Sequence, residues 1–233
     1  MQLVSPARLL LVLCALALGA CAASNRRVED FTAFKGGKDA VILVLPVDAE
    51  LSELSFGGYP TTRRDWTLAA REHMNAHLRA ALQKRTVATV FDETQEPDEG
   101  TAKLLRLHAA VGQSIMSHQY EGPAKLPTKA NGFDWTLGTD ARALGQGSGA
   151  NYALFIHVRD SYSGAGRVMA QAIAAAVFGI PLQGGMQTGF ASLVDLQTGQ
   201  VVWFNRLQRG AGDLRTHEAA METVEALLAG LPE

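Results

Sequence analysis

The run of residues 40–47, AVILVLPV, constrains the fold most, because it is apolar along its whole length. A strand with one face in water alternates apolar and polar residues, whereas an uninterrupted apolar run is typical of a central strand covered on both faces. Pro46 has no backbone N–H to donate, so we expect this strand to end at an unpaired or edge position. The run therefore predicts a sheet with helices on both sides.

The chain after this strand alternates between helical and strand-like patterns. Apolar residues recur at helical spacing from Trp66 to Leu78, which predicts a helix capped by Thr61 or Thr62. Residues 51–60 are rich in turn formers and predict a loop. The other helices are expected within 101–117, 134–144, 167–178 and 213–231, and the other strands at 87–91, 152–158, 188–196 and 200–207.

The last two strands are joined by a turn in which Asp195 comes early and Gly199 occupies the left-handed position, which predicts a β-hairpin. Asp213 is the expected cap of the helix that follows. Helical crossovers favour parallel strands and a hairpin is antiparallel. We therefore predict one α/β domain at residues 39–233, a mixed β-sheet of about five strands with helices on both faces and a C-terminal hairpin plus helix.

Charge and cysteine content exclude several classes of protein. The 21 basic residues are balanced by 23 acidic ones, for a net charge of −2, and they form no block of like charge. Nucleic acid is therefore not expected as a partner. The only cysteines are Cys14 and Cys21, so the domain can carry neither a disulfide framework nor a Cys-rich zinc site.

The N-terminus has the pattern of a processing signal. Residues 9–18, LLLVLCALAL, are too short to cross a bilayer of about 30 Å but have the length of a signal-peptide core. They end in Leu18-Gly19-Ala20-Cys21, which resembles the lipobox of bacterial lipoproteins. The alternative is a general secretory signal that is cut after Ala20 and happens to precede a cysteine.

The lipobox resemblance implies a membrane anchor. Residues 1–20 would be removed as signal peptide, Cys21 would carry the acyl chains, including palmitate, and residues 21–38 would form the tether. Diacylglyceryl and N-acyl chains together provide stable attachment to the lipid bilayer. Ala22 stands where lipoproteins sorted to the inner membrane usually carry Asp, so we expect the periplasmic face of the outer membrane, with the inner membrane as the alternative.

Three passages resemble a group of α/β lipoproteins. They are VILVLPV, TDARALGQGSGANYALFIHV and GFASLVDLQTGQVVWFNR, beginning at residues 41, 139 and 189. Their order is similar to that of the curli-secretion CsgG, TolB N-terminal and peptidoglycan-synthase-activator lipoproteins, although Asn151 replaces an Asp that such proteins often carry. The resemblance covers most of residues 40–230 and implies an envelope assembly or secretion accessory. It marks no chemistry, and fold alone does not define function.

The residues that could carry chemistry are few. His73 and His77 lie one helical turn apart, but Met74 stands where a zinc-protease helix needs Glu, so we predict a structural pair and no metal. Residues 145–149, GQGSG, close a helix instead of opening one, which predicts a turn and not a phosphate loop. His157, Arg159 and Asp160 end the third predicted strand, where α/β folds often bind ligands, and form the one ligand-site candidate.

The predicted helix at 167–178 is unusually rich in small residues. Its alanines leave little side-chain volume for a core and permit close backbone approach. Two interpretations stay open, a tightly packed crossover helix and a surface that docks on another helix or a membrane. The candidate partner-binding residues are Ala172, Ala174, Ala175 and Ala176.

These observations predict a lipid-anchored periplasmic protein that binds an envelope protein partner without catalysis and without a cofactor. Two alternatives remain, a subunit of an oligomeric outer-membrane secretion complex and a periplasmic enzyme with a site near the end of the third strand. The oligomeric state is not predicted.

Overall fold

The structure, a computed structural model, describes residues 34, 40–85, 87–92, 97–120, 126–129, 132–178, 185–210 and 213–232. The predicted signal peptide, Cys21 and nearly all of the tether lie outside the described residues.

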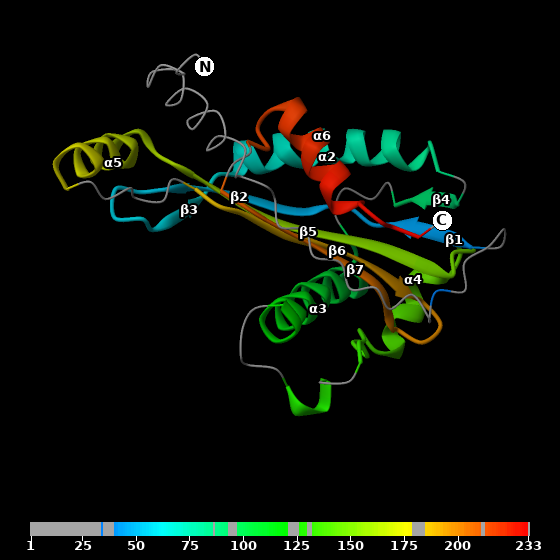
Figure 1. The fold of residues 1–233 in the computed structure, drawn as a ribbon. Coiled ribbons are helices and arrows are strands. Elements are labelled where there is room, and N and C mark those ends of the chain that lie inside the picture. The colour runs from blue at the N-terminus through cyan, green and yellow to red at the C-terminus, as the bar shows by residue number, and fades with distance from the viewer. Residues whose placement is uncertain are drawn as a thin grey trace, which may run out of the picture.

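A mixed sheet forms the centre of the domain and confirms the predicted α/β class (Figure 1). The long strand β5 pairs in parallel with β1 at one end and with β2 at the other, and its opposite edge pairs antiparallel with β6. The strand order is therefore β4–β1–β5–β6–β7 at one end of the sheet and β3–β2–β5–β6–β7 at the other end. The strands are β1 (Val41–Val44), β2 (Asp48–Leu54), β3 (Pro60–Thr62), β4 (Ala88–Phe91), β5 (Tyr152–Ser163), β6 (Gln187–Asp195) and β7 (Val201–Arg209).

Helices cover both faces of the sheet, as predicted (Figure 1). Side chains alternate along β5, so Leu154 and Ile156 pack in the core below α2 (Arg64–Leu82) and α6 (His217–Leu227). Phe155 points to the other face, toward α3 (Glu99–Ile115) and the short α4 (Arg142–Gly145). Three short helical turns lie at Met116–Tyr120, Pro127–Lys129 and Thr139–Ala141, and α5 (Ala165–Phe178) follows β5.

The predicted loop at 51–60 is partly wrong, because it contains the end of β2 and the start of β3. The apolar run at 40–47 is interrupted near Pro46, so that β1 ends at Val44 and β2 begins at Asp48. The residues of β2, DAELSEL, have no strong strand signature of their own. Pairing with β5 from Asp48 to Leu54 makes them a strand.

Helix starts are the least accurate part of the sequence interpretation. Thr61 and Thr62 belong to β3, and α2 begins after Arg63 with no side-chain cap. The cap of α6 is Thr216, whose hydroxyl accepts from the Ala219 N–H, while Asp213 instead binds the side chain of Arg215. The predicted turns are confirmed, with left-handed glycines in the 145–149 turn and at the hairpin position 199.

Candidate functional site

The helix α5 lies outside the layered body of the domain (Figure 1). The structure describes no buried side chain in it, so the interpretation as a core crossover helix is wrong. The reason is the length of β5, which runs five residues beyond the predicted end at Val158 and places the next helix past the main body. Of the candidate alanines, Ala172, Ala175 and Ala176 are exposed and Ala174 is half-buried.

Large apolar side chains project from this helix into solvent. Met169 and Val177 are each 65% exposed, and Val168 and Ile173 are about half exposed. The polar Gln171 is half-buried, because its amide donates to the Ser163 hydroxyl at the end of β5. Apart from Arg167 at the first turn, the rest of the helix carries no charge. Its outer surface is therefore apolar.

The turn between β2 and β3 extends the same apolar surface. Phe56 and Tyr59 are 74% and 77% exposed, and Gly58 between them adopts a left-handed conformation. A side chain at Gly58 would collide with the guanidinium of Arg167, so this turn lies against the start of α5. We define the apolar tip as Phe56, Tyr59, Val168, Met169, Ile173 and Val177. It holds six of the eleven large apolar side chains that the structure describes as exposed, and such a concentration is typical of a docking surface.

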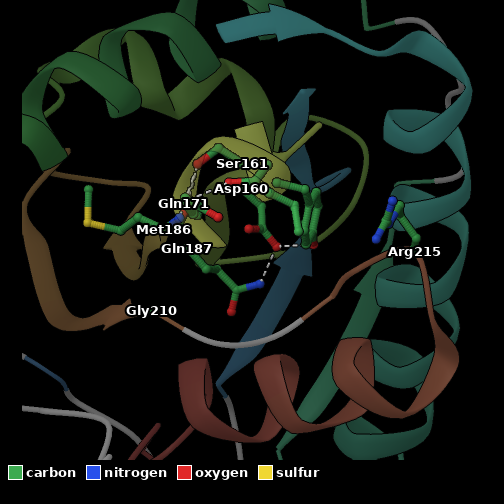
Figure 2. A pocket seen from close by; sticks show the side chains of 11 residues that line it. Asp160, Ser161, Gln171, Met186, Gln187, Gly210 and Arg215 are labelled. Carbon is green, nitrogen blue, oxygen red and sulfur yellow. Dashed lines mark hydrogen bonds between the residues drawn. The ribbon is translucent and has the colours of Figure 1, made fainter. Parts of the chain in front are cut away.

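A hollow of about 300 Å³ lies at the base of α5 (Figure 2). Asp160 lines it from the end of β5, and its Oδ2 accepts hydrogen bonds from Tyr162 Oη at 2.5 Å and Gln187 Nε2 at 2.7 Å. Burial raises the pKa of Asp160 to about 6, although these hydrogen bonds act in the opposite direction. Burial also raises the pKa of Tyr162, helped by the nearby Asp160 carboxylate.

The polar contacts of Asp160 continue into the body of the protein. Gln187 Oε1 accepts from Arg209 Nε at 2.6 Å and from the Thr223 hydroxyl at 3.1 Å, and Arg209 also donates to Thr223. The Leu214 N–H donates to Tyr162 Oη at 2.7 Å. This network connects β5, β6 and β7 to α6. The Asp160 carboxylate therefore has a structural role.

We expect the buried Asp160 to give the protein a measurable pH dependence of stability. A carboxyl with a folded pKa of about 6, above its ordinary value, binds protons more tightly in the folded state. Its stabilising contribution is complete below about pH 4 and is lost as the pH rises through about 6, by on the order of 2 kcal/mol. Asn can accept the same hydrogen bonds without ionising. We expect the free energy of unfolding of the wild type, minus that of Asp160→Asn, to fall between pH 4 and pH 7, and urea unfolding at each pH measures it.

The comparison with Asp160→Asn cancels the titration of other groups, since both proteins share them. If the free energy of unfolding of the wild type minus that of Asp160→Asn stays constant across this range, or rises with pH, the pKa of Asp160 is not raised.

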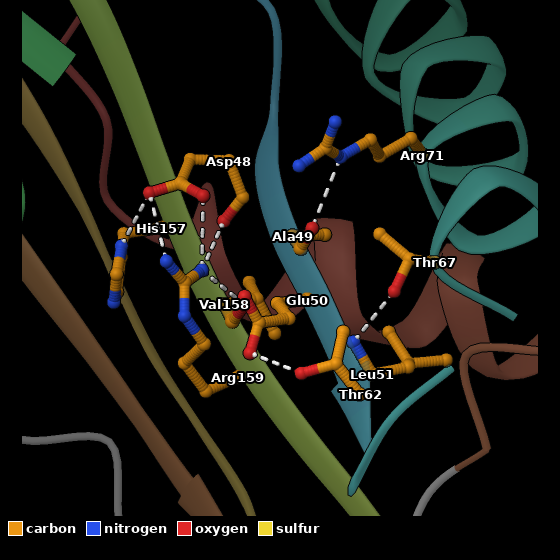
Figure 3. Close-up of polar contacts among 10 residues, drawn as sticks. All are labelled: Asp48, Ala49, Glu50, Leu51, Thr62, Thr67, Arg71, His157, Val158 and Arg159. Carbon is orange, nitrogen blue, oxygen red and sulfur yellow. Dashed lines mark hydrogen bonds and ion pairs between the residues drawn. The ribbon is translucent and has the colours of Figure 1, made fainter. Parts of the chain in front are cut away.

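The predicted ligand cluster of His157, Arg159 and Asp160 is divided between the two faces of the sheet. His157 and Arg159 both bind Asp48 at the start of β2, with His157 Nδ1 at 2.8 Å and Arg159 Nη1 at 3.0 Å from its carboxylate (Figure 3). Asp160 points to the opposite face. Burial alone would raise the pKa of Asp48, but hydrogen bonds from His157 and Arg159 outweigh it and hold that pKa well below its usual range.

A third histidine lies beside the His73 and His77 pair of α2. His217 lies at the start of α6. Its Nδ1 atom is 2.5 Å from Nε2 of His77, and its ring stacks on that of His73. In stacked rings the nitrogen lone pairs do not point toward a common position, where a metal ion would bind. Among the described residues, no group of three or more possible metal ligands is present. The spacing of His73 and His77 was visible in the sequence, but the third ring was not.

Comparisons with known proteins find no family. No family model matches the chain, and no curated protein matches it. Among solved structures, the PelC dodecamer from Paraburkholderia phytofirmans is similar to it, both as a variant with one substitution and without that substitution. The two structures share 13% and 12% identity, with TM-scores of 0.40 and 0.42, and the matches cover 89% and 90% of this chain and 96% and 99% of the PelC chains. Likeness at this level assigns neither a function nor an assembly to the chain.

No helix in the described part of the chain is long and apolar enough to cross a membrane. With 14 residues at 1.5 Å per residue, α5 is about 21 Å long, shorter than the hydrocarbon core of about 30 Å.

Proposed function

We propose that this chain is a lipid-anchored, non-catalytic accessory protein of the cell envelope that docks through its apolar tip. The anchor would be the acylated Cys21, and the location the periplasmic face of the outer membrane. The exposed apolar surface of α5 and the β2–β3 turn carries the proposal, because a soluble domain gains nothing from presenting such a surface to water.

The membrane surface is the occupant that the chemistry of the tip favours. A helix that docks on one protein partner keeps a polar side toward water, whereas the outward surface of α5 is apolar and its one internal polar residue, Gln171, bonds back to β5. The aromatic rings of Phe56 and Tyr59 suit the boundary between headgroups and acyl chains. An acyl anchor plus an apolar patch gives the two signals that stable attachment needs.

A protein partner in the envelope is the second candidate for the tip. Ala172, Ala175 and Ala176 are exposed and small, and small residues let another helix approach closely. In that case the lipid anchor would hold the domain near its partner, and the tip would contact a helix of that partner instead of lipid.

A vesicle-binding assay separates the two candidates. The mature chain from residue 22, which lacks acyl chains, is mixed with vesicles of phosphatidylethanolamine and phosphatidylglycerol, and binding is measured by co-flotation. Because a carboxylate at hydrocarbon depth costs about 2.5–3.5 kcal/mol, Ile173→Glu should weaken binding about ten-fold or more. Ile173 is half exposed, so the fold should not change.

Met221→Glu is the matched control, since Met221 is also an exposed apolar residue but lies on α6, away from the tip. Equal binding of the two variants would contradict membrane docking. A different pair of results would favour the protein partner over the membrane surface. In that case the wild-type chain does not bind vesicles, and Ala175→Glu abolishes a crosslink to an envelope protein in cells. Palmitate labelling that is lost in Cys21→Ser tests the anchor by itself.

A further inference from the structure

A large cleft, separate from the apolar tip, opens where β4 ends beside the junction of β1 and β2. Its volume is about 1040 Å³, and it extends between α2 on one face of the sheet and the first turns of α3 on the other. Residues 44–48, from the end of β1 to the start of β2, line it. In sheets with parallel strands, the carboxyl ends of the strands are the usual place for a bound ligand, and β1 and β4 are parallel.

One stripe of α2 faces this cleft along most of the helix. Arg64, Arg71 and Arg79 lie on it together with Leu68, Glu72 and Asn75, at spacings of three and four residues. The neighbouring stripe, which includes Met74 and Leu78, is buried in the core. Packing of the core stripe therefore fixes the direction in which the arginine stripe points.

Among the described residues that line the cleft, arginines outnumber acids. Arg106 of α3 and Arg159 of β5 join the three of α2, and the acidic lining residues are Asp48, Glu72 and Asp92. The whole chain carries a net charge of −2, so this surplus of positive charge is a local feature.

Several of these charged groups already have structural roles. Arg159 is bound to Asp48, and Arg71 Nε donates to the Ala49 carbonyl on the open edge of β2 at 3.0 Å (Figure 3). Arg79 stacks over the ring of Phe91. In contrast, Arg64 and Arg106 are exposed, and neither makes a hydrogen bond or ion pair with any residue that the structure describes. They stand on different helices on two sides of the cleft.

We propose that this cleft binds an anionic ligand that carries phosphate or carboxylate groups. The guanidinium groups of Arg64 and Arg106 would bind it from the two walls, since the guanidinium fork matches both oxyanions in a bidentate manner. The terminal nitrogens of Arg71, whose Nε is fixed by the β2 edge, would contribute from the same stripe of α2. The Asp48 carboxylate is already paired, because it forms an ion pair with Arg159 and a hydrogen bond with His157.

Titration calorimetry on the purified full chain tests this site, with tripolyphosphate as the probe and citrate in a second series, both at one fixed ionic strength. The double variant Arg64→Gln/Arg106→Gln should weaken binding about ten-fold or more, since hydrogen bonds to charged groups are the strong ones. Its thermal unfolding should match wild type, because both side chains are exposed and unpaired within the described residues. Preference between the two probes identifies phosphate or carboxylate as the bound group.

The control Lys84→Gln/Arg142→Gln removes the same charge from exposed positions that do not line the cleft. It should change the affinity by no more than about two-fold, the size expected from long-range electrostatics. If both double variants lose the same affinity for the probe, the loss comes from the change in net charge and not from the cleft, and the proposal is overturned. Absence of binding to both probes in the wild-type chain would overturn it as well.

Discussion

Replacing Asn205 by Asp is expected to lower the free energy of unfolding by about 3–5 kcal/mol, the cost of an unpaired charge in a core. Asn205 on β7 is 1% exposed, and its amide nitrogen donates to three carbonyls at the end of α6. These are the carbonyls of Ala226 at 2.8 Å, Leu227 at 2.9 Å and Ala229 at 3.3 Å. The last carbonyls of a helix have no partner within the helix, so this side chain supplies what the helix lacks. An Asp side chain has nearly the same shape, but its carboxylate cannot donate a hydrogen bond. It would place a negatively charged acceptor against the carbonyl oxygens.

Urea unfolding followed by circular dichroism at pH 7 measures this loss. Asn151→Asp is the matched control, because Asn151 is exposed and its Oδ1 accepts from the Val41 N–H, a role that a carboxylate also fills. The same chemical change should therefore cost little at position 151. Similar losses at the two positions would show that the donor role of Asn205 is not the cause.

Gly112→Ala should lower the free energy of unfolding by about 3 kcal/mol, the upper range for overpacking a dense core. In an exposed helix interior the same change would stabilise by about 1 kcal/mol. Gly112 lies in α3 directly above the ring of Phe190, and a methyl group there would overlap the ring edge. Phe190 is 2% exposed and stacks between His157 and Phe204, so it has no space to withdraw.

Gly166→Ala in α5 is the control for helix propensity, since a methyl group at that position meets nothing within 4 Å. Thermal and urea unfolding should show stability unchanged or slightly raised for Gly166→Ala and clearly lowered for Gly112→Ala. If Gly112→Ala is as stable as wild type, the close packing of α3 on Phe190 is incorrect.

The packing around Phe190 also explains why His108 is tolerated in the core. Its ring stacks on Phe155 and its Nε2 lies 2.9 Å from the Ser192 hydroxyl, while burial lowers its pKa to about 3. The side chain is therefore neutral at physiological pH and acts as a flat, hydrogen-bonded core residue. It lies on the buried face of α3, together with Leu104 and Ile115.

Elements with a strong local pattern could be predicted from the sequence. The helical spacing of Met74 and Leu78 in α2 and of Leu104 and Ile115 in α3 identifies both helices and their buried faces. The turn around Gly199 identifies the β6–β7 hairpin. These features depend on residues close together in the chain, so periodicity and turn chemistry are sufficient to predict them.

Features that depend on distant residues were decided only by the tertiary structure. The strand β2 exists because it pairs with β5, and the divided cluster of His157, Arg159 and Asp160 follows from the alternation of side chains along a strand longer than predicted. The sequence predicted α5 as a helix and its small residues as unusual. Whether those residues are buried depended on where β5 ends, because burial is a property of the surroundings and not of the segment.

The candidate sites show the same division. Cys21 and the alanines of α5 could be selected from local sequence, because a lipobox and a run of small residues are short patterns. Asn205 under the end of α6, His217 beside His77, and the arginine-lined cleft each join residues from different elements. No spacing rule connects such residues in one sequence, since the distance between them along the chain is set by the topology of the sheet.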